Sequence, residues 1–232
     1  MSIRGALGFE VNSEADPPEA RRLRWELVRR IAAVTPWPEG EVWDERVLAV
    51  MAAVPRHLFV PEMGLYDAYR DEPLPIGNGQ TISQPTMVAL MTQALHLTGR
   101  ERVLEVGTGS GYQAAILSPL AREVWSVERI EALGNAAMAR FAALGIQNVH
   151  VRIGDGYQGL LSAAPFHRIV LTAAPAVLPH ELTLQLADGG ICVAPVGDAF
   201  LQTLMRWTKK DGKLSRESLG AVRFVPMLEG VE

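Results

Sequence analysis

The chain has 232 residues, 48% of them hydrophobic, which suits one α/β domain with additions and a sizeable core. Its formal net charge of −4 and its lack of a Lys/Arg cluster beyond Lys209-Lys210 argue against a broad nucleic-acid-binding surface. The single cysteine, Cys192, excludes an internal disulfide, and no apolar run approaches the length of a membrane span, so we expect a soluble cytoplasmic protein without a membrane partner.

The first part of the chain is predicted to be mainly helical. Residues 1–18 are polar and are expected to form a flexible arm. A helical apolar stripe predicts one helix over 19–34, and a second is predicted over 42–54, ending before Pro55. The proline-rich stretch 59–78 is predicted to be irregular.

A further helix is predicted over 84–97, with Ser83 as its N-cap and Pro85 in its first turn. The loop before it contains two glycines and places the hydroxyls of Thr81 and Ser83 near a helix N-terminus. Such a place suits an anion, for instance a carboxylate. The loop by itself favours the simpler alternative, in which Ser83 only caps the helix.

The run Val103-Leu-Glu-Val-Gly-Thr-Gly-Ser-Gly111 predicts a buried strand followed by a sharp turn at Gly107, Gly109 and Gly111. An Ala- and Leu-rich helix is predicted over 112–120. Strand, turn and helix make the first unit of a doubly wound sheet, in which ligands bind beyond the carboxyl ends of the strands. Gly107, Thr108, Gly109 and Gly111 are therefore candidate cofactor-binding residues.

The charge of this loop bears on the ligand. Its glycine spacing differs from the dinucleotide pattern G-x-G-x-x-G, and Glu105 stands two positions before Gly107. A carboxylate there would repel a pyrophosphate but suit a cation. S-adenosylmethionine, which carries an ammonium and a sulfonium, fits better than NAD. The alternative is an ordinary glycine-rich turn with a solvated Glu.

Two more predicted strands end in carboxylates. The strand 123–127 ends at Glu128, about 20 residues after the glycine loop, where doubly wound folds bind a ribose diol. The strand 149–153 leads into Asp155, which could accept a hydrogen bond from an adenine amino group, and Gly156 lets the backbone come close. Glu128 as a neighbour of a helix cap and Asp155 as a turn former are the alternatives. Together the three strand ends predict S-adenosylmethionine as the cofactor.

The last part of the chain completes the predicted fold. A fourth strand over 168–172, a short helix over 179–186 and a fifth strand over 191–196 precede an antiparallel pair, 201–209 and 214–225, around Asp211-Gly212. We therefore predict a doubly wound, mostly parallel, Rossmann-like α/β sheet with an N-terminal helical cap and a C-terminal antiparallel strand pair. The predicted single domain covers 19–232, with the cap and a substrate loop over 19–98 and the cofactor-binding sheet over 99–232.

Several kinds of chemistry lack a signal. The five histidines show no metal-ligand spacing, so no metal is expected, and no G-x-S-x-G nucleophile motif is present. The fourth strand ends in Leu171-Thr-Ala-Ala-Pro175 instead of the (Asp/Asn)-Pro-Pro-aromatic run of methyltransferases that modify base nitrogens. A DNA or RNA base is therefore not expected as substrate.

Further runs extend these motifs along the chain. They are Ala53-Val-Pro-Arg-His-Leu-Phe-Val-Pro61, Ala68-Tyr-Arg-Asp-Glu-Pro-Leu-Pro-Ile-Gly77, Gly79-Gln-Thr-Ile-Ser-Gln-Pro85, Glu105-Val-Gly-Thr-Gly-Ser-Gly-Tyr-Gln113, Ser126-Val-Glu-Arg-Ile130, Gly154-Asp-Gly-Tyr157 and Val222-Arg-Phe-Val-Pro226. Over about residues 42–228 the chain resembles the protein-L-isoaspartate (D-aspartate) O-methyltransferase family. The Gly-Gln-Thr-Ile-Ser piece is specific to that family. Asn78 and Thr86 depart from it, standing where members often carry an aromatic residue or histidine.

The resemblance implies a reaction and roles for residues. The free α-carboxylate of an isoaspartyl residue in a damaged protein would attack the methyl group of S-adenosylmethionine, and the methyl ester would then close to a succinimide. Such a carboxylate is already ionised at neutral pH and needs no general base. The implied roles are catalysis for Ser83, lining of the same pocket for Thr81 and Ile82, substrate contacts for Ile82, Ser83 and Val225, and cofactor contacts for Glu105, Glu128 and Asp155.

D-aspartyl activity is implied only by kinship, and a monomer is favoured over an oligomer. Two other functions remain open. One is an aspartate O-methyltransferase that serves one dedicated peptide, against which the lack of a long C-terminal extension counts modestly. The other is a non-catalytic adaptor that binds S-adenosylmethionine, which the retention of Ser83 and Glu105 disfavours.

Overall fold

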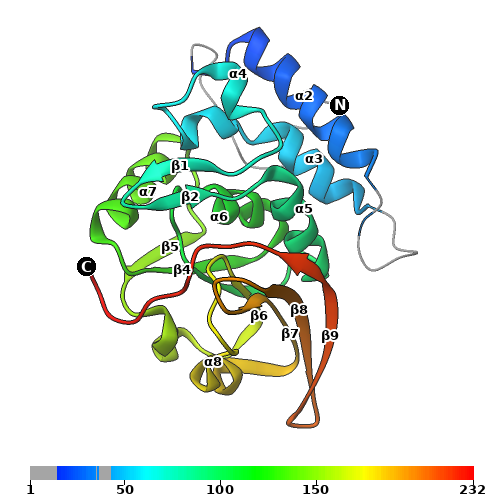
Figure 1. The fold of residues 1–232 in the computed structure, drawn as a ribbon, viewed down its shortest axis with the longest axis vertical. Helices are drawn as coiled ribbons and strands as arrows, with labels where there is room; N and C mark the ends of the chain where they lie inside the picture. The colour runs from blue at the N-terminus through cyan, green and yellow to red at the C-terminus, as the bar shows by residue number, and fades with distance from the viewer. Residues whose placement is uncertain (1–14, 35, 37–42) are drawn as a thin grey trace.

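The computed structural model describes residues 15–34, 36 and 43–232, and its centre is a seven-stranded sheet in the order β5-β4-β3-β6-β7-β8-β9 (Figure 1). The strands from β5 to β7 are parallel to their neighbours, and β7, β8 and β9 are antiparallel. This confirms the predicted fold class. The strands are β3 (Arg102–Val106), β4 (Glu123–Glu128), β5 (Val149–Ile153), β6 (Phe166–Leu171), β7 (Leu186–Gly197), β8 (Gln202–Lys210) and β9 (Lys213–Val222).

The inner parallel strands β3 and β6 are mostly buried on both faces, as their apolar sequences require, whereas the edge strand β5 has an exposed Arg152. Val103 and Val124 belong to the core beneath most of the helices, whereas Leu104, Val106 and Val127 belong to the core on the opposite face. Consecutive residues thus enter different cores because side chains alternate along a strand. The helices are α2 (Pro18–Ala32), α3 (Glu45–Ala53), α4 (Leu65–Ala68), α5 (Pro85–Ala94), α6 (Tyr112–Leu117), α7 (Glu131–Ala143) and α8 (His180–Gln185).

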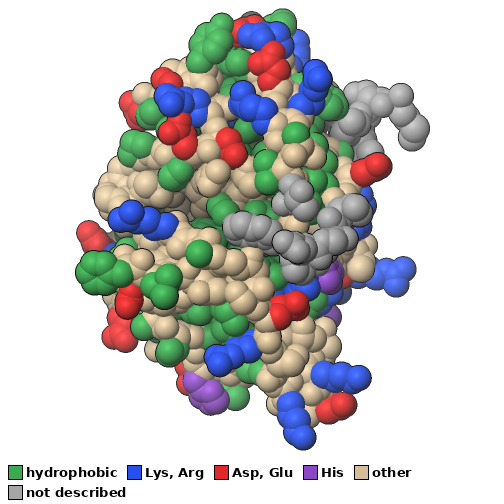
Figure 2. Space-filling model, turned by 45° about the vertical axis from the view of Figure 1, so that its right-hand side comes forward, with side chains coloured by type: hydrophobic (Ala, Val, Ile, Leu, Met, Phe, Trp, Pro, Cys, Tyr) green, Lys and Arg blue, Asp and Glu red, His purple; other side chains and the backbone are tan. Residues whose placement is uncertain are grey.

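The N-terminal helices form the predicted cap over one end of the sheet (Figure 1). Residues 1–14 of the predicted arm lie outside the described residues, but Asp16 is buried and its carboxylate pairs with Arg24 at 2.9 Å. A flexible arm therefore cannot continue to residue 18. The helix predicted to begin at 42 begins at Glu45, because the Asp44 carboxylate accepts the Arg46 N–H. On the face shown in Figure 2, acidic and basic side chains are mixed over the cap.

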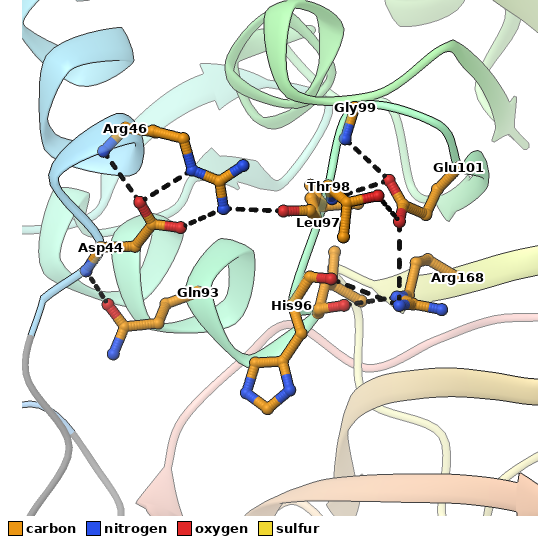
Figure 3. A network of polar contacts seen from close by, with 10 residues as sticks. Asp44, Arg46, Gln93, His96, Leu97, Thr98, Gly99, Glu101 and Arg168 are labelled. Carbon is orange, nitrogen blue, oxygen red and sulfur yellow. Dashed lines mark hydrogen bonds and ion pairs between the residues drawn. The ribbon is translucent and has the colours of Figure 1, made fainter.

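A polar network joins the cap to the start of the sheet (Figure 3). The backbone N–H of Asp44 donates to Gln93 at the end of α5, and Arg46 donates to the carbonyl of Leu97. The Glu101 carboxylate accepts the backbone N–H of Thr98 and lies 3.9 Å from Arg168 of β6. These contacts fix the carboxyl end of α5 against β3 and β6.

The end of the region predicted to be irregular, 59–78, forms β1 (Leu74–Gly77), which pairs with β2 (Gln80–Ile82) in an antiparallel hairpin. Its turn has three consecutive residues with positive φ, Gly77, Asn78 and Gly79. The prolines concealed the strand signal, although proline is tolerated in a two-stranded edge. The predicted antiparallel pair is present as the hairpin β8–β9, with Asp211 and Gly212 left-handed at its turn.

The start of α5 also differs from the prediction. The N-cap is Gln84, not Ser83, and its side chain makes no capping hydrogen bond. Pro85 occupies the first turn as predicted. Ser83 thus lies between the hairpin and the helix. Among the described helices, none has the length and apolar character needed to cross a membrane.

Candidate functional site

A cleft opens at the carboxyl ends of β3 and β4, where a doubly wound sheet binds its ligands. It contains about 830 Å³ of empty space with its open mouth included. Its walls come from the glycine loop, the end of β4, the hairpin with Ser83, and the C-terminal segment. The residues that line it are Gln80, Thr81, Ile82, Ser83, Val88, Val106, Gly107, Thr108, Gly109, Ser110, Tyr112, Gln113, Val127, Glu128, Arg129, Ile130, Gly156, Thr172, Ala173, Val225, Pro226, Met227 and Leu228.

The floor of the cleft is the turn after β3. Gly107 has a φ of +97°, and a Cβ there would lie 2.4 Å from the hydroxyl of Thr172. Its N–H donates to the carbonyl of Val127 at 2.8 Å, which ties the turn to β4. The backbone is therefore fixed and bare where a ligand can approach it.

Gly111 serves the fold of this turn and does not line the cleft. It has a φ of +87°, and a Cβ there would lie 2.8 Å from the ring of Phe141 in α7. The glycine lets α6 begin close against α7. A cofactor contact of Gly111 stays a prediction, and the packing explains the glycine without one.

Glu128 is the carboxylate that faces the cleft. It is 5% exposed, and its two oxygens accept the N–H groups of Gly109 at 2.8 Å and Ile130 at 2.9 Å. These bonds fix its orientation, and each oxygen keeps a further lone pair for a ligand hydroxyl. The predicted ribose contact is compatible with this geometry.

Glu105 lies beneath the cleft instead of lining it, so its contact with the methionine end of the cofactor stays a prediction. It is fully buried and accepts a hydrogen bond from the Ser126 hydroxyl, which lies 2.6 Å from that of Thr108. Burial raises its pKa from 4.5 to about 8. Glu105 therefore supports Thr108 through Ser126 from beneath the cleft.

Asp155 also lies outside the cleft lining, and its neighbour Gly156 forms part of it. The Asp155 carboxylate accepts the N–H of Tyr157 at 2.9 Å and caps a short 3₁₀ turn. This is the turn-forming alternative of the sequence analysis. At Gly156 a Cβ would lie 2.5 Å from Val106 and 3.0 Å from Met227, so a side chain would fill this end of the cleft.

The opposite wall brings together the predicted substrate-side residues. Thr81 and Ile82 come from the hairpin, Ser83 directly follows it, and Val225 comes from the segment after β9. Within the described residues, no hydrogen bond engages the Ser83 hydroxyl. The carbonyl of Val225 accepts the N–H of Ala174 at 2.8 Å, which docks the C-terminal segment beside β6.

The sequence analysis missed several residues of the lining. Tyr112 and Gln113 directly follow the glycine loop, and this adjacency was the signal available for them. The C-terminal residues Met227 and Leu228 carry no local motif. They reach the cleft because Met227 donates its N–H to the carbonyl of Ala174, a contact between distant segments.

The residues present fit S-adenosylmethionine. Bare backbone at Gly107 and Gly156 allows close approach, and the Glu128 carboxylate suits a diol. The lining around these groups is largely apolar and includes Val106, Val127, Ile130 and Met227. Mostly apolar walls with a few fixed polar groups are typical of a cofactor site.

Comparisons with known proteins agree with this geometry. The model of the family described as "Protein-L-isoaspartate(D-aspartate) O-methyltransferase (PCMT)" matches residues 37–232. A protein-L-isoaspartate O-methyltransferase of Dictyoglomus thermophilum is 49% identical over 91% of this chain and 94% of its own length. One of Halorhodospira halophila is 48% identical over 99% of both chains. A solved Plasmodium falciparum structure, described as a protein-L-isoaspartate O-methyltransferase with S-adenosyl-L-homocysteine, superposes with a TM-score of 0.75 at 26% identity, covering 90% of this chain and 98% of that one.

Proposed function

Because the chain belongs to the protein-L-isoaspartate (D-aspartate) O-methyltransferase family, we propose that it methylates the free α-carboxylate of L-isoaspartyl residues in damaged proteins and peptides. S-adenosylmethionine supplies the methyl group when it is bound. The product is a methyl ester, the activated form from which repair begins. The observation that carries the proposal is the position of the Ser83 hydroxyl. It makes no hydrogen bond within the described residues and lies in the same cleft as Glu128 and the glycine loop.

The cleft has the chemistry that a carboxylate nucleophile needs. A substrate carboxyl with an ordinary pKa near 3.5 to 4 is ionised at neutral pH, so the enzyme has to orient it and remove water from it. Among the described residues, the lining of the cleft contains no His or Lys that could act as a base. The wall that carries Ser83 can contribute a hydroxyl and backbone N–H groups, which would orient the substrate carboxylate.

Ser83 is the residue we assign to that orientation. It lies after β2 and before α5, and because Gln84 is the N-cap residue, the Ser83 hydroxyl does not cap the helix. The hydroxyl can donate a hydrogen bond to the substrate carboxylate. Ile82 packs beside it, and the N–H of Val225 has no acceptor among the described residues and can bind the substrate backbone.

The cofactor would be held by the other wall of the cleft, which consists of the glycine loop, the end of β4 and the surface around Gly156. We assign the ribose hydroxyls to Glu128, the adenine end to the surface around Gly156 and Met227, and the methionine end to the turn from Gly107 to Gly109. Thr81 lines the cleft from the hairpin. Glu105 supports this site from beneath through Ser126 and Thr108.

We extend the proposal to D-aspartyl residues and to a cytoplasmic monomer, as expected from the sequence. The alternatives of a dedicated peptide substrate or a non-catalytic adaptor have no observation in their favour.

A matched pair of peptides that differ only in Asp or isoAsp tests the function. We expect incubation with methyl-labelled S-adenosylmethionine to place base-labile label on the isoAsp peptide alone. A D-Asp peptide in a third reaction tests the extension. Equal labelling of the Asp and isoAsp peptides, or no labelling of either, would contradict the proposed function.

A further inference from the structure

Asp71 joins the two ends of the β1–β2 hairpin without lining the cleft. It lies before β1, yet its carboxylate accepts three hydrogen bonds from residues that follow β2. Two come from Thr86, from its N–H at 2.8 Å and its hydroxyl at 2.6 Å, and the third comes from the Gln84 amide at 3.2 Å. The hairpin is thus closed at its base by one side chain.

We call these three hydrogen bonds from Thr86 and Gln84 to the Asp71 carboxylate the clamp, and the start of α5 explains why it is needed. Pro85 has no N–H, and the side chain of the N-cap residue Gln84 makes no capping bond. The first N–H that needs an acceptor is therefore that of Thr86, and Asp71 supplies it from outside the helix. A carboxylate is favoured at this position because the N-terminus of a helix carries partial positive charge. Thr86, a departure from the family pattern, strengthens the clamp with its hydroxyl.

Ser83 is held between two fixed neighbours. On one side Ile82 is 3% exposed and pairs with Leu74 of β1. On the other side Gln84 is bound by Asp71. The backbone of Ser83 can therefore move little while the clamp is intact.

A buried arginine anchors the segment that carries Asp71. Arg56 is fully buried and donates to the carbonyls of Ala68 at 3.0 Å and Glu72 at 3.4 Å. Its guanidinium lies over the ring of Tyr112, 5.0 Å from the ring centre, and Tyr112 lines the cleft after the glycine loop. Arg56 thus links Tyr112, next to the glycine loop, to the backbone on both sides of Asp71, and the Asp71 carboxylate binds two of the three residues that follow Ser83.

We propose that Asp71 is a positioning residue for methyl transfer, which sets the Ser83 hydroxyl relative to the glycine loop by clamping Thr86 and Gln84. This inference rests on the proposed function. It predicts that loss of the clamp impairs use of the peptide and leaves cofactor binding intact.

The test compares Asp71→Ala with Glu72→Ala, which removes the neighbouring, half-exposed carboxylate that pairs with Arg70. We expect Asp71→Ala to lower kcat/KM for the isoAsp peptide by about 10-fold or more, since small misplacements of reacting groups can cost up to about 100-fold. The Kd for S-adenosyl-L-homocysteine, measured by calorimetry, should match that of the wild type. Glu72→Ala should match it in both measurements. Thr86→Val, which keeps the shape and the N–H, should show a smaller loss in the same direction.

A second readout needs no turnover. Exchange of the backbone amide hydrogens of Ser83, Gln84 and Thr86 should become faster in Asp71→Ala and in Thr86→Val, and not in Glu72→Ala. The inference fails if wild-type protein methylates the isoAsp peptide and Asp71→Ala behaves like Glu72→Ala. An equal loss of cofactor affinity and of kcat/KM would also overturn it, since the effect would then be a general one. If Asp71→Ala does not fold, Thr86→Val decides by the same criteria. Wild-type protein that leaves the peptide unmethylated would refute the proposed function, and unchanged exchange in the variants would refute the clamp.

Discussion

The two walls of the cleft are built in different ways. The cofactor wall grows from the ends of adjacent parallel strands, and backbone hydrogen bonds hold it, such as that from Gly107 to Val127. The substrate wall joins a two-stranded hairpin to a C-terminal segment far away in the sequence, and it depends on side chains such as Asp71. Changes in the first wall should therefore alter cofactor affinity, and changes in the second should alter turnover.

The largest effect is expected where the cofactor wall is most constrained. Gly107→Ala forces a side chain to a φ of +97° and into the Thr172 hydroxyl. The backbone strain alone is worth about 1–3 kcal/mol. We expect the affinity for S-adenosyl-L-homocysteine to fall by about 100-fold, or about 3 kcal/mol, in a calorimetric titration.

Gly99→Ala is the matched control for this change. Gly99 has a φ of +93° but nothing within 4 Å of an added Cβ, and it precedes β3. It should lower stability and leave cofactor affinity unchanged. Equal losses of affinity in the two variants would show that the contact with Thr172 is unimportant.

On the substrate wall, Ser83→Ala should lower kcat by about 10- to 100-fold through lost orientation of the substrate. Cofactor affinity should hardly change, because the hydroxyl makes no bond within the described residues. Steady-state kinetics with the isoAsp peptide measure the loss. Ser162→Ala, at an exposed serine outside the cleft lining, is the control. Turnover near the wild-type level would remove Ser83 from the mechanism.

Glu128→Gln tests the fixed carboxylate of the cofactor wall. The amide keeps the shape but places an NH₂ group against the N–H of Gly109 or Ile130. We expect about 10-fold weaker binding of S-adenosyl-L-homocysteine, since a hydrogen bond to a charged group is worth about 1.5–3 kcal/mol. Glu123→Gln, at the other end of the same strand, should bind normally. Normal binding by Glu128→Gln would mean that the carboxylate makes no important cofactor contact.

The smallest effect on ligand binding is expected at Glu105, which lies beneath the floor of the cleft and is tested through stability instead. Folding raises its pKa from 4.5 to about 8 through burial. The folded protein keeps this proton while the unfolded chain loses it, so the free energy of unfolding falls as the pH rises from about 4.5 to about 8. Glu105→Gln, which mimics the neutral acid, should lose this part of the pH dependence in urea unfolding at pH 5, 7 and 8. A parallel decline in both proteins would contradict a buried neutral carboxyl.

The same contrast explains what the sequence could predict. The strands from β3 to β7 have local apolar signatures, and their ends place Gly107, Thr108, Gly109 and Glu128 in the cleft lining, whereas Glu105, Gly111 and Asp155 do not line it. The hairpin has a weak local signal because β1 contains a proline and β2 is only three residues long. The position of Glu105 in the motif does not reveal that its side chain is buried. The clamp at Asp71 and the docking of Met227 arise from contacts between distant segments, which no local pattern encodes.

A crystal structure with S-adenosyl-L-homocysteine tests most directly whether the two walls form one active site. We expect the ribose hydroxyls within hydrogen-bond distance of Glu128, the adenine against Gly156 and Met227, and the sulfur on the side of the cleft that carries Ser83. A ligand bound elsewhere, or bound with its sulfur directed away from Ser83, would contradict this account.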